Sequence, residues 1–155
     1  MRKYIYTGGG IFIFFLFFLK FFLQPFVPLL WLKVDEAFHR GDYKKAEEYL
    51  GAIIWLQPKN PSPYILKGWL EWSRAKYLQS IGCPYEEILK KAEKTYKIGE
   101  KRIPGNWQLY FEEGIMWEAF GMKEKSLKAY YLASKYAKPP YNRIYYYKKK
   151  KFEKE

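Results

Sequence analysis

The chain has 155 residues, enough for one domain, with 22% aromatic residues and a formal net charge of +12. It holds one histidine, His39, and one cysteine, Cys83, so it cannot build a histidine–cysteine metal site, a catalytic triad or an internal disulfide. No glycine-rich phosphate loop is present, because the three consecutive glycines fall inside an apolar run. We therefore expect no catalytic residues, no metal site, no cofactor and no enzyme, and the lone thiol leaves open only a disulfide to another chain.

The first predicted element, residues 1–24, is a short basic head followed by a membrane anchor. Residues 5–23 are apolar except for Thr7, three glycines and Lys20. Residues 4–23 would just span a bilayer core as a helix rising about 1.5 Å per residue, and Lys20 is close enough to the end to reach the interface. A cleaved signal peptide is the alternative. Because no small-residue cleavage site comes after the apolar run, we favour an uncleaved single-pass anchor.

The orientation of the anchor is less constrained by the sequence. Lysine and arginine flank the apolar run on both sides, so their distribution discriminates poorly. A very short basic head before a single span usually stays in the cytoplasm, which predicts an extracytoplasmic location for the rest of the chain. Only residues 24–27 separate the run from the next predicted helix, so we expect the domain to sit on the membrane with Trp31 at the interface.

A predicted helix over residues 28–40 is followed by the stretch 41–60, which opens with a turn at Gly41 and Asp42, runs as an amphipathic helix and ends at Gln57 and the prolines after it. Its apolar residues fall mostly three or four apart and form one face: Tyr43, Ala46, Leu50, Ile53, Ile54 and Leu56. This stretch resembles the second helix of a tetratricopeptide repeat (TPR), a 34-residue helical hairpin. The resemblance implies that small Ala46 lets two helices approach, while Tyr43, Leu50 and Ile54 lock them together.

The resemblance recurs with one insertion. Tyr64 and Gly68 match the aromatic and close-packing positions of a first helix, and so do Tyr110 and Gly114, 46 residues later. One period of 34 plus 12 extra residues also brings four residues of the middle unit into register: Ala92, Tyr96, Gly99 and Pro104. The resemblance therefore implies three TPR-like hairpins, at 28–60, 61–104 and 105–138, with the middle one the longest.

Residues 139–155 form a basic tail that we expect to make a capping helix, since repeat arrays need one to cover their last apolar edge. Tyr141, Ile144 and Tyr145 are spaced to lie on the repeats. The predicted fold is all-α: an N-terminal transmembrane helix, an α–α superhelix of three TPR-like hairpins, and this C-terminal cap.

In the TPR family, partner peptides usually lie in the concave surface made by the first helices. The register implies a protein-binding groove of nine residues: Trp31, Asp35, Phe38, Ile65, Trp69, Trp72, Phe111, Ile115 and Glu118. His39 and Ser73 fall in the same register. The groove lacks the lysine, arginine and asparagine of carboxylate-clamping relatives, so an apolar helix or an extended hydrophobic segment is the expected ligand. Trp69 and Trp72 are the expected anchors. The alternative is that these aromatics are core, or covered by the long hairpin or the tail.

The part of the chain after Lys20 carries a formal charge of +9, of which residues 138–155 supply +5. A cluster in the tail suits a polyanion: Arg143, Lys148, Lys149, Lys150 and Lys151. Anionic lipid would gain about 1 kcal/mol per lysine. Nucleic acid is the other candidate, disfavoured by the anchor, and solvated surface lysines are the simplest explanation.

These features predict a membrane-anchored TPR adaptor or scaffold. We expect its partner to be a protein, a membrane-associated or envelope assembly component bound in the aromatic groove, and not a small molecule. The competing hypothesis is a membrane-tethered binder of anionic lipid or nucleic acid that works through the lysine-rich tail.

Overall fold

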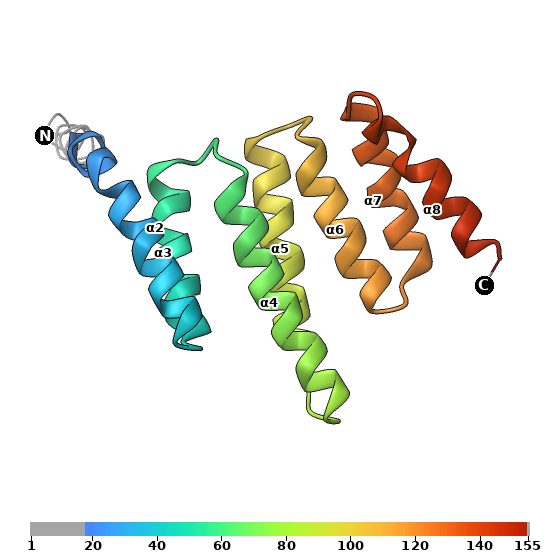
Figure 1. The fold of residues 1–155 in the computed structure, drawn as a ribbon, viewed down its shortest axis with the longest axis horizontal. Coiled ribbons are helices and arrows are strands. Elements are labelled where there is room, and N and C mark those ends of the chain that lie inside the picture. The colour runs from blue at the N-terminus through green and yellow to red at the C-terminus, as the bar shows by residue number, and fades with distance from the viewer. Residues whose placement is uncertain (1–17, 155) are drawn as a thin grey trace, which may run out of the picture.

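The computed structural model describes residues 18–154, and those residues form helices and no strand (Figure 1). Residues 18–23 are helical and lead through a short 3-10 helix, η1 (Gln24–Phe26), into three helix pairs and a terminal helix. The elements are α2 (Val27–His39) with α3 (Tyr43–Leu56), α4 (Ser62–Ser80) with α5 (Glu86–Arg102), α6 (Trp107–Ala119) with α7 (Lys123–Tyr136), then η2 (Tyr141–Arg143) and α8 (Ile144–Phe152). The all-α class predicted from the sequence is confirmed.

The structure leaves the predicted transmembrane helix untested. Most of it, residues 1–17, lies outside the described residues. Within residues 18–154, no helix combines the length and the apolar character that crossing a bilayer requires. The anchor therefore stays a prediction.

The first helix of the first and last pairs ends in the same way. The amide of Gly41 donates to Phe38 O at 3.0 Å and that of Asp42 to Ala37 O at 2.9 Å; Gly121 and Met122 repeat both bonds at the end of α6. Gly41 and Gly121 have φ of 73° and 71°, a left-handed conformation that glycine adopts without a steric penalty. Each glycine thus allows an abrupt reversal into the second helix of its pair.

Helices within a pair approach closely because small and large residues oppose each other. A Cβ on Gly68 would lie 2.5 Å from Cζ of the fully buried Tyr96, and one on Gly114 would lie 2.6 Å from Cε1 of Tyr130. In the first pair the equivalent residues are Val34 and Leu50, both in one core cluster. A larger residue on the first helix is therefore matched by a smaller one on the second.

The middle pair is the longest, and in Figure 1 it projects past its neighbours. α4 has 19 residues against 13 in α2 and α6, whereas α5 has 17 against 14 in α3 and α7. The insertion therefore extends the first helix more than the second. Residues 81–85 form the turn between the two helices.

Buried carboxylates join neighbouring helices across the array. Glu47 on α3 pairs with Lys91 on α5 at 2.6 Å and with Arg74 on α4 at 3.2 Å. Glu71, which is fully buried, accepts a hydrogen bond from Thr95 Oγ1 at 2.6 Å and pairs with Lys67. Both buried carboxylates thus have basic side chains beside them, as burial of a charge requires.

The tail forms the terminal helix α8, which packs beside α7 where the first helix of a further pair would lie (Figure 1). The amide of Tyr145 donates to Ser134 Oγ at 2.7 Å, and the rings of Tyr145 and Tyr131 meet edge to face at 5.5 Å. Tyr141 stacks on Trp107 instead, with ring centroids 4.9 Å apart, because η2 carries it back toward the start of α6.

Candidate protein-binding groove

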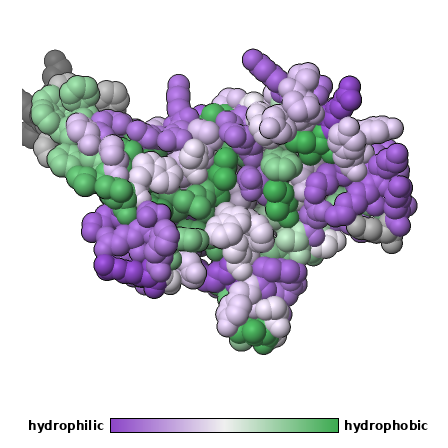
Figure 2. All heavy atoms as spheres, in the orientation of Figure 1, coloured by the Kyte–Doolittle hydropathy of each residue, from purple (hydrophilic) through white to green (hydrophobic). Residues whose placement is uncertain are grey.

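An aromatic hollow of about 520 Å³ lies between α2, the start of α3 and α4. It is lined by Phe38, Tyr43, Trp69, Leu70, Ser73, Arg74 and Tyr77. A second hollow of about 260 Å³ adjoins it, shares Phe38 and Trp69, and adds Trp31, Val34, Asp35 and Leu66. Figure 2 shows hydrophobic residues gathered on this face between α2 and α4. We call the two hollows together the α2–α4 groove.

Four aromatic side chains of the groove are exposed to solvent, whereas Trp31 is half-buried against the first core cluster. Phe38 is 37% exposed and Trp69 38%, and Tyr77 on the projecting part of α4 is 63% exposed. The ring of Phe38 lies 6.3 Å from that of Trp69 and 5.7 Å from that of Tyr43. Large apolar side chains from three helices thus surround one concavity, an arrangement typical of protein-binding sites.

The polar groups around the groove are few. Arg74 in its wall is directed to the buried Glu47, and Asp35 at its rim is exposed near His39, with 3.4 Å between Asp35 Oδ1 and the ring Nδ1. The groove can therefore bury apolar surface of a ligand, while offering little to recognise a charged one.

Four of the nine predicted groove residues line the α2–α4 groove: Trp31, Asp35, Phe38 and Trp69. Trp72 meets Trp69 edge to face at 6.4 Å but packs partly against the second core cluster, and its Nε1 is buried without a hydrogen-bond partner in the described chain. Ile65 packs against the same cluster. The two predicted anchors are therefore not equivalent, since only Trp69 lines the groove.

The three residues predicted from the last pair lie outside this groove. Phe111 is half-buried between Trp107 and Tyr130, with ring centroids 6.1 and 5.8 Å away, and Ile115 is also half-buried. Glu118 accepts hydrogen bonds from Tyr130 Oη at 2.6 Å and from two lysines of α8. On α6, the side chains at the predicted groove positions therefore contact other residues of the chain.

Those two lysines belong to the tail cluster predicted to bind a polyanion. Lys148 Nζ lies 2.6 Å from Glu118 Oε2, and Lys151 Nζ lies 2.9 Å from Glu118 Oε1. Burial alone would raise the pKa of Glu118, but the hydrogen bonds from Lys148, Tyr130 and Lys151 hold that pKa at about 2. Lys149 lies 3.9 Å from Glu153, while Arg143 and Lys150 are exposed. The cluster is thus divided between structural ion pairs and open side chains.

Sequence reasoning missed part of the groove, notably Tyr43, Arg74 and Tyr77. A usable signal exists for one of them: Trp69, Ser73 and Tyr77 are spaced four apart, so they form a stripe along α4. The register of a 34-residue unit hides this stripe, because Tyr77 falls in the extension that the unit lacks.

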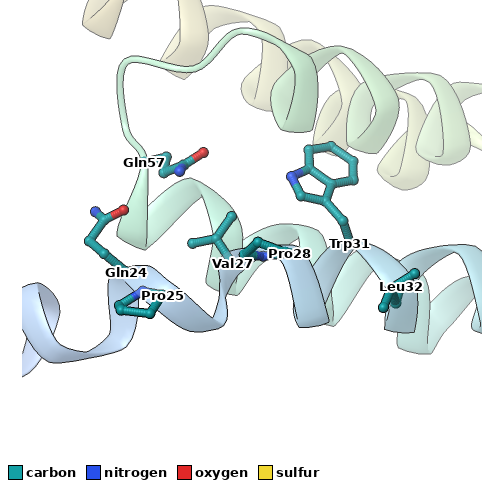
Figure 3. A pocket seen from close by; sticks show the side chains of 7 residues that line it. All are labelled: Gln24, Pro25, Val27, Pro28, Trp31, Leu32 and Gln57. Carbon is teal, nitrogen blue, oxygen red and sulfur yellow. The ribbon is translucent and has the colours of Figure 1, made fainter.

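A shallower hollow of about 670 Å³ lies where η1 and the start of α2 meet the end of α3 (Figure 3). Gln24 Nε2 donates to Leu56 O at 2.8 Å and so ties the N-terminal segment to α3. The remaining lining residues are Pro25, Val27, Pro28, Trp31, Leu32 and Gln57. None of the lining residues is charged, and the surface continues into exposed apolar residues of the segment before α2.

Residues 18–154 contain no cluster of histidine, cysteine, aspartate and glutamate that could hold a metal ion. Comparison with protein families, with curated proteins and with solved structures found no match to this chain. The resemblance to the TPR family therefore rests on the spacing of this chain's own residues.

Proposed function

We propose that this chain is an adaptor of TPR-like helical hairpins, held at a membrane by its N-terminal apolar run, which binds a protein partner in the α2–α4 groove. The observation that carries the proposal is the 520 Å³ hollow with exposed Phe38, Tyr43, Trp69 and Tyr77 on three helices. Tryptophan and tyrosine are enriched among residues that dominate binding energy.

The chemistry of the groove favours an apolar segment of a partner. Its walls are aromatic, and its one basic residue, Arg74, is directed to Glu47. A carboxylate terminus or a phosphate would find no free cation among the residues that line it. A helix or extended strand that presents hydrophobic side chains would bury apolar area against Phe38 and Trp69.

The polyanion hypothesis draws less support from the tail. Lys148 and Lys151 are engaged by Glu118, which leaves Arg143, Lys149 and Lys150 of the predicted cluster. Loss of those two lysines from a binding surface would remove about 1 kcal/mol each of attraction to an anionic surface.

Site-specific photo-crosslinking in membranes of cells that express the full chain tests the proposal. A benzophenone amino acid at Tyr77 should crosslink to a protein partner, and the crosslink should weaken at least roughly thirtyfold in a Trp69→Ala background, as loss of a hot spot predicts. The matched control places the same group at Tyr147, which is 61% exposed on α8. Equal crosslinking from both positions, or no dependence on Trp69, would contradict the proposal.

A further inference from the structure

The two edges of the helix array differ in what they carry. The turns within the pairs lie along one edge, and the connections between pairs lie along the other (Figure 1). These connections are residues 57–61, 103–106 and 137–143. Because α2 starts from the same side as α4 and α6, the N-terminal residues 18–26 enter at this edge as well. We call these connections, with the helix ends beside them, the connection edge.

The connection edge has almost no acidic residues. Each stretch that crosses it is free of aspartate and glutamate, namely residues 18–34, 49–70, 101–111 and 125–152. Basic residues with exposed side chains lie in or beside the connections: Lys59, Lys101, Arg102, Lys138 and Arg143. The opposite edge, in contrast, carries Asp42, Glu86, Glu87 and Glu124 close to its turns.

Among the described residues, the one carboxyl directly beside these connections is that of Glu100. Burial, together with hydrogen bonding to Glu113 and the charge of that group, raises the pKa of Glu100 to about 8. Glu100 is also paired with Lys97, whose Nζ lies 3.0 Å from Glu100 Oε2, so it offsets little of the positive charge of the connections.

Aromatic rings accompany the basic residues along this edge. Trp107 and Tyr141 stack at 4.9 Å, and Tyr110 and Tyr136 stack at 5.6 Å. Trp55 is 43% exposed, and its ring lies 6.0 Å from Lys20 Nζ. A hollow of about 420 Å³ is lined by Lys20, Trp55, Pro58, Lys59 and Arg102. Tryptophan and tyrosine beside lysine and arginine are the side chains enriched where proteins meet the bilayer interface.

An apolar stripe enters the connection edge from the N-terminal side. Its members are spaced three or four residues apart and are more than half exposed: Phe18, Phe22, Phe26, Leu29 and Leu32. The stripe continues the apolar run of residues 5–23 into the first turns of α2. Exposed apolar surface of this extent, continuous with an anchor sequence, suits contact with lipid.

We propose that the connection edge docks on an anionic lipid bilayer, with its basic side chains at the headgroups and its aromatic rings in the interface. The proposal rests on the membrane attachment in the proposed function and deepens it by assigning the lipid contact. It also assigns the lipid contact to different lysines. Lys59, Lys101 and Lys138 lie at the bilayer surface, whereas Lys148 and Lys151 form ion pairs with Glu118. Docking in this way directs the projecting turn at Cys83 away from the membrane.

The native Cys83 supplies a built-in probe of this orientation, since it is the only cysteine and is exposed in the α4–α5 turn. The full chain is reconstituted in nanodiscs with a fluorophore on Cys83 or, in a Cys83→Ser background, on Gln108→Cys or Asn142→Cys. A lipid with a spin-labelled headgroup then quenches fluorophores near the surface. We expect strong quenching at positions 108 and 142 and little at Cys83, in discs that contain phosphatidylglycerol but not in discs of phosphatidylcholine alone.

Charge variants test the cause of docking. Lys59, Lys101 and Lys138 have exposed side chains, and Lys44, Lys45 and Lys90, also exposed, lie on the other side of the array. Replacing the first three by glutamine should lower the ratio of docked to undocked molecules roughly a hundredfold, about fivefold per residue. Replacing the second three changes the net charge equally and should leave quenching at 108 and 142 unchanged.

Several results would overturn the proposal. They are equal quenching at Cys83 and the edge positions, quenching that is the same in both lipid mixtures, or equal loss in the two triple variants. Failure of the full chain to incorporate into the discs would overturn the membrane attachment as well. Incorporation with unquenched edge positions would overturn docking alone and leave the groove proposal untouched.

Discussion

The α2–α4 groove and the α6–α8 end of the molecule use equivalent positions differently. Trp69 on α4 corresponds to Ile115 on α6, and Trp72 to Glu118, each 46 residues apart. At the first position, Trp69 is an exposed indole in the open groove, whereas Ile115 is half-buried. At the second, Trp72 packs against the second core cluster, whereas Glu118 is held by Lys148 and Lys151 of the terminal helix. The same register therefore yields a candidate binding surface in one half and a structural clasp in the other.

The difference shows that a repeat register fixes the face on which a residue lies but not whether that face is open. Openness depends on the next helices along the array. The first helix of the pair after α4 is six residues shorter, so the end of α4 with Tyr77 stands free. After α6 come α7 and a basic helix, whose lysines reach back to Glu118.

The largest expected effect separates an open tryptophan from a buried one. Trp117→Ala should lower the free energy of unfolding by about 3–5 kcal/mol, because Trp117 is 3% exposed and its Nε1 donates to Glu113 Oε1 at 3.2 Å. Trp69→Ala should lower it by less than about 1.5 kcal/mol, because its indole is already partly in water. Chemical denaturation of the full chain in detergent measures both values.

Trp72→Ala makes the comparison sharper. Trp72 packs against the second core cluster and touches Trp69, so its variant should fall between the other two. A loss for Trp69→Ala as large as that for Trp117→Ala would mean that the groove tryptophan is core, and the groove proposal would fail.

The second prediction replaces the Gly68–Tyr96 packing of the middle pair by the Val–Leu combination found in the first pair. Gly68→Val should destabilise the protein by about 1–3 kcal/mol, since its Cβ would overlap the ring of buried Tyr96. Adding Tyr96→Leu recreates the Val34–Leu50 combination of the first pair and should restore part of the loss. Equilibrium unfolding of the wild type, both single variants and the double variant gives the coupling energy. Additive effects would show that the two positions do not compensate each other.

The close approach of the two helices in each pair was predictable because it depends on residue size at fixed spacing. Gly68, Tyr96, Gly114 and Tyr130 meet as the register indicates, and the all-α class agrees with the helical periodicity. The longer middle pair was predictable from one insertion. The turn at residues 81–85 was predictable as well, because Gly82 and Pro84 both favour a turn over continued helix.

The site was less predictable, because exposure depends on distant parts of the chain. Phe38 and Trp69 are 31 residues apart, and only the packing of α3 against both α2 and α4 makes them line one hollow. Glu118 was predicted to be a groove residue because no neighbouring residue in the sequence indicates that it forms ion pairs with Lys148 and Lys151. The connection edge was likewise hidden, since its lysines are scattered along the chain and topology alone brings them to one side.

The smallest expected effect concerns the clasp at Glu118. Its pKa is held at about 2 in the folded protein by Lys148, Tyr130 and Lys151, below the ordinary 4.5 that it regains on unfolding. A depressed pKa contributes stability that is complete above pH 4.5 and is lost as the pH falls toward 2. Glu118→Gln should therefore cost about 1–2 kcal/mol at neutral pH, as loss of hydrogen bonds to a charged group does, and almost nothing near pH 2. Denaturation midpoints of the two proteins across this pH range give the difference directly.

The control is Glu124→Gln, which replaces an exposed carboxylate at the start of α7 and should show no such convergence. If the difference between wild type and Glu118→Gln were constant with pH, the ion pairs would not be what holds α8, and apolar packing against α7 would have to account for the closed end of the array.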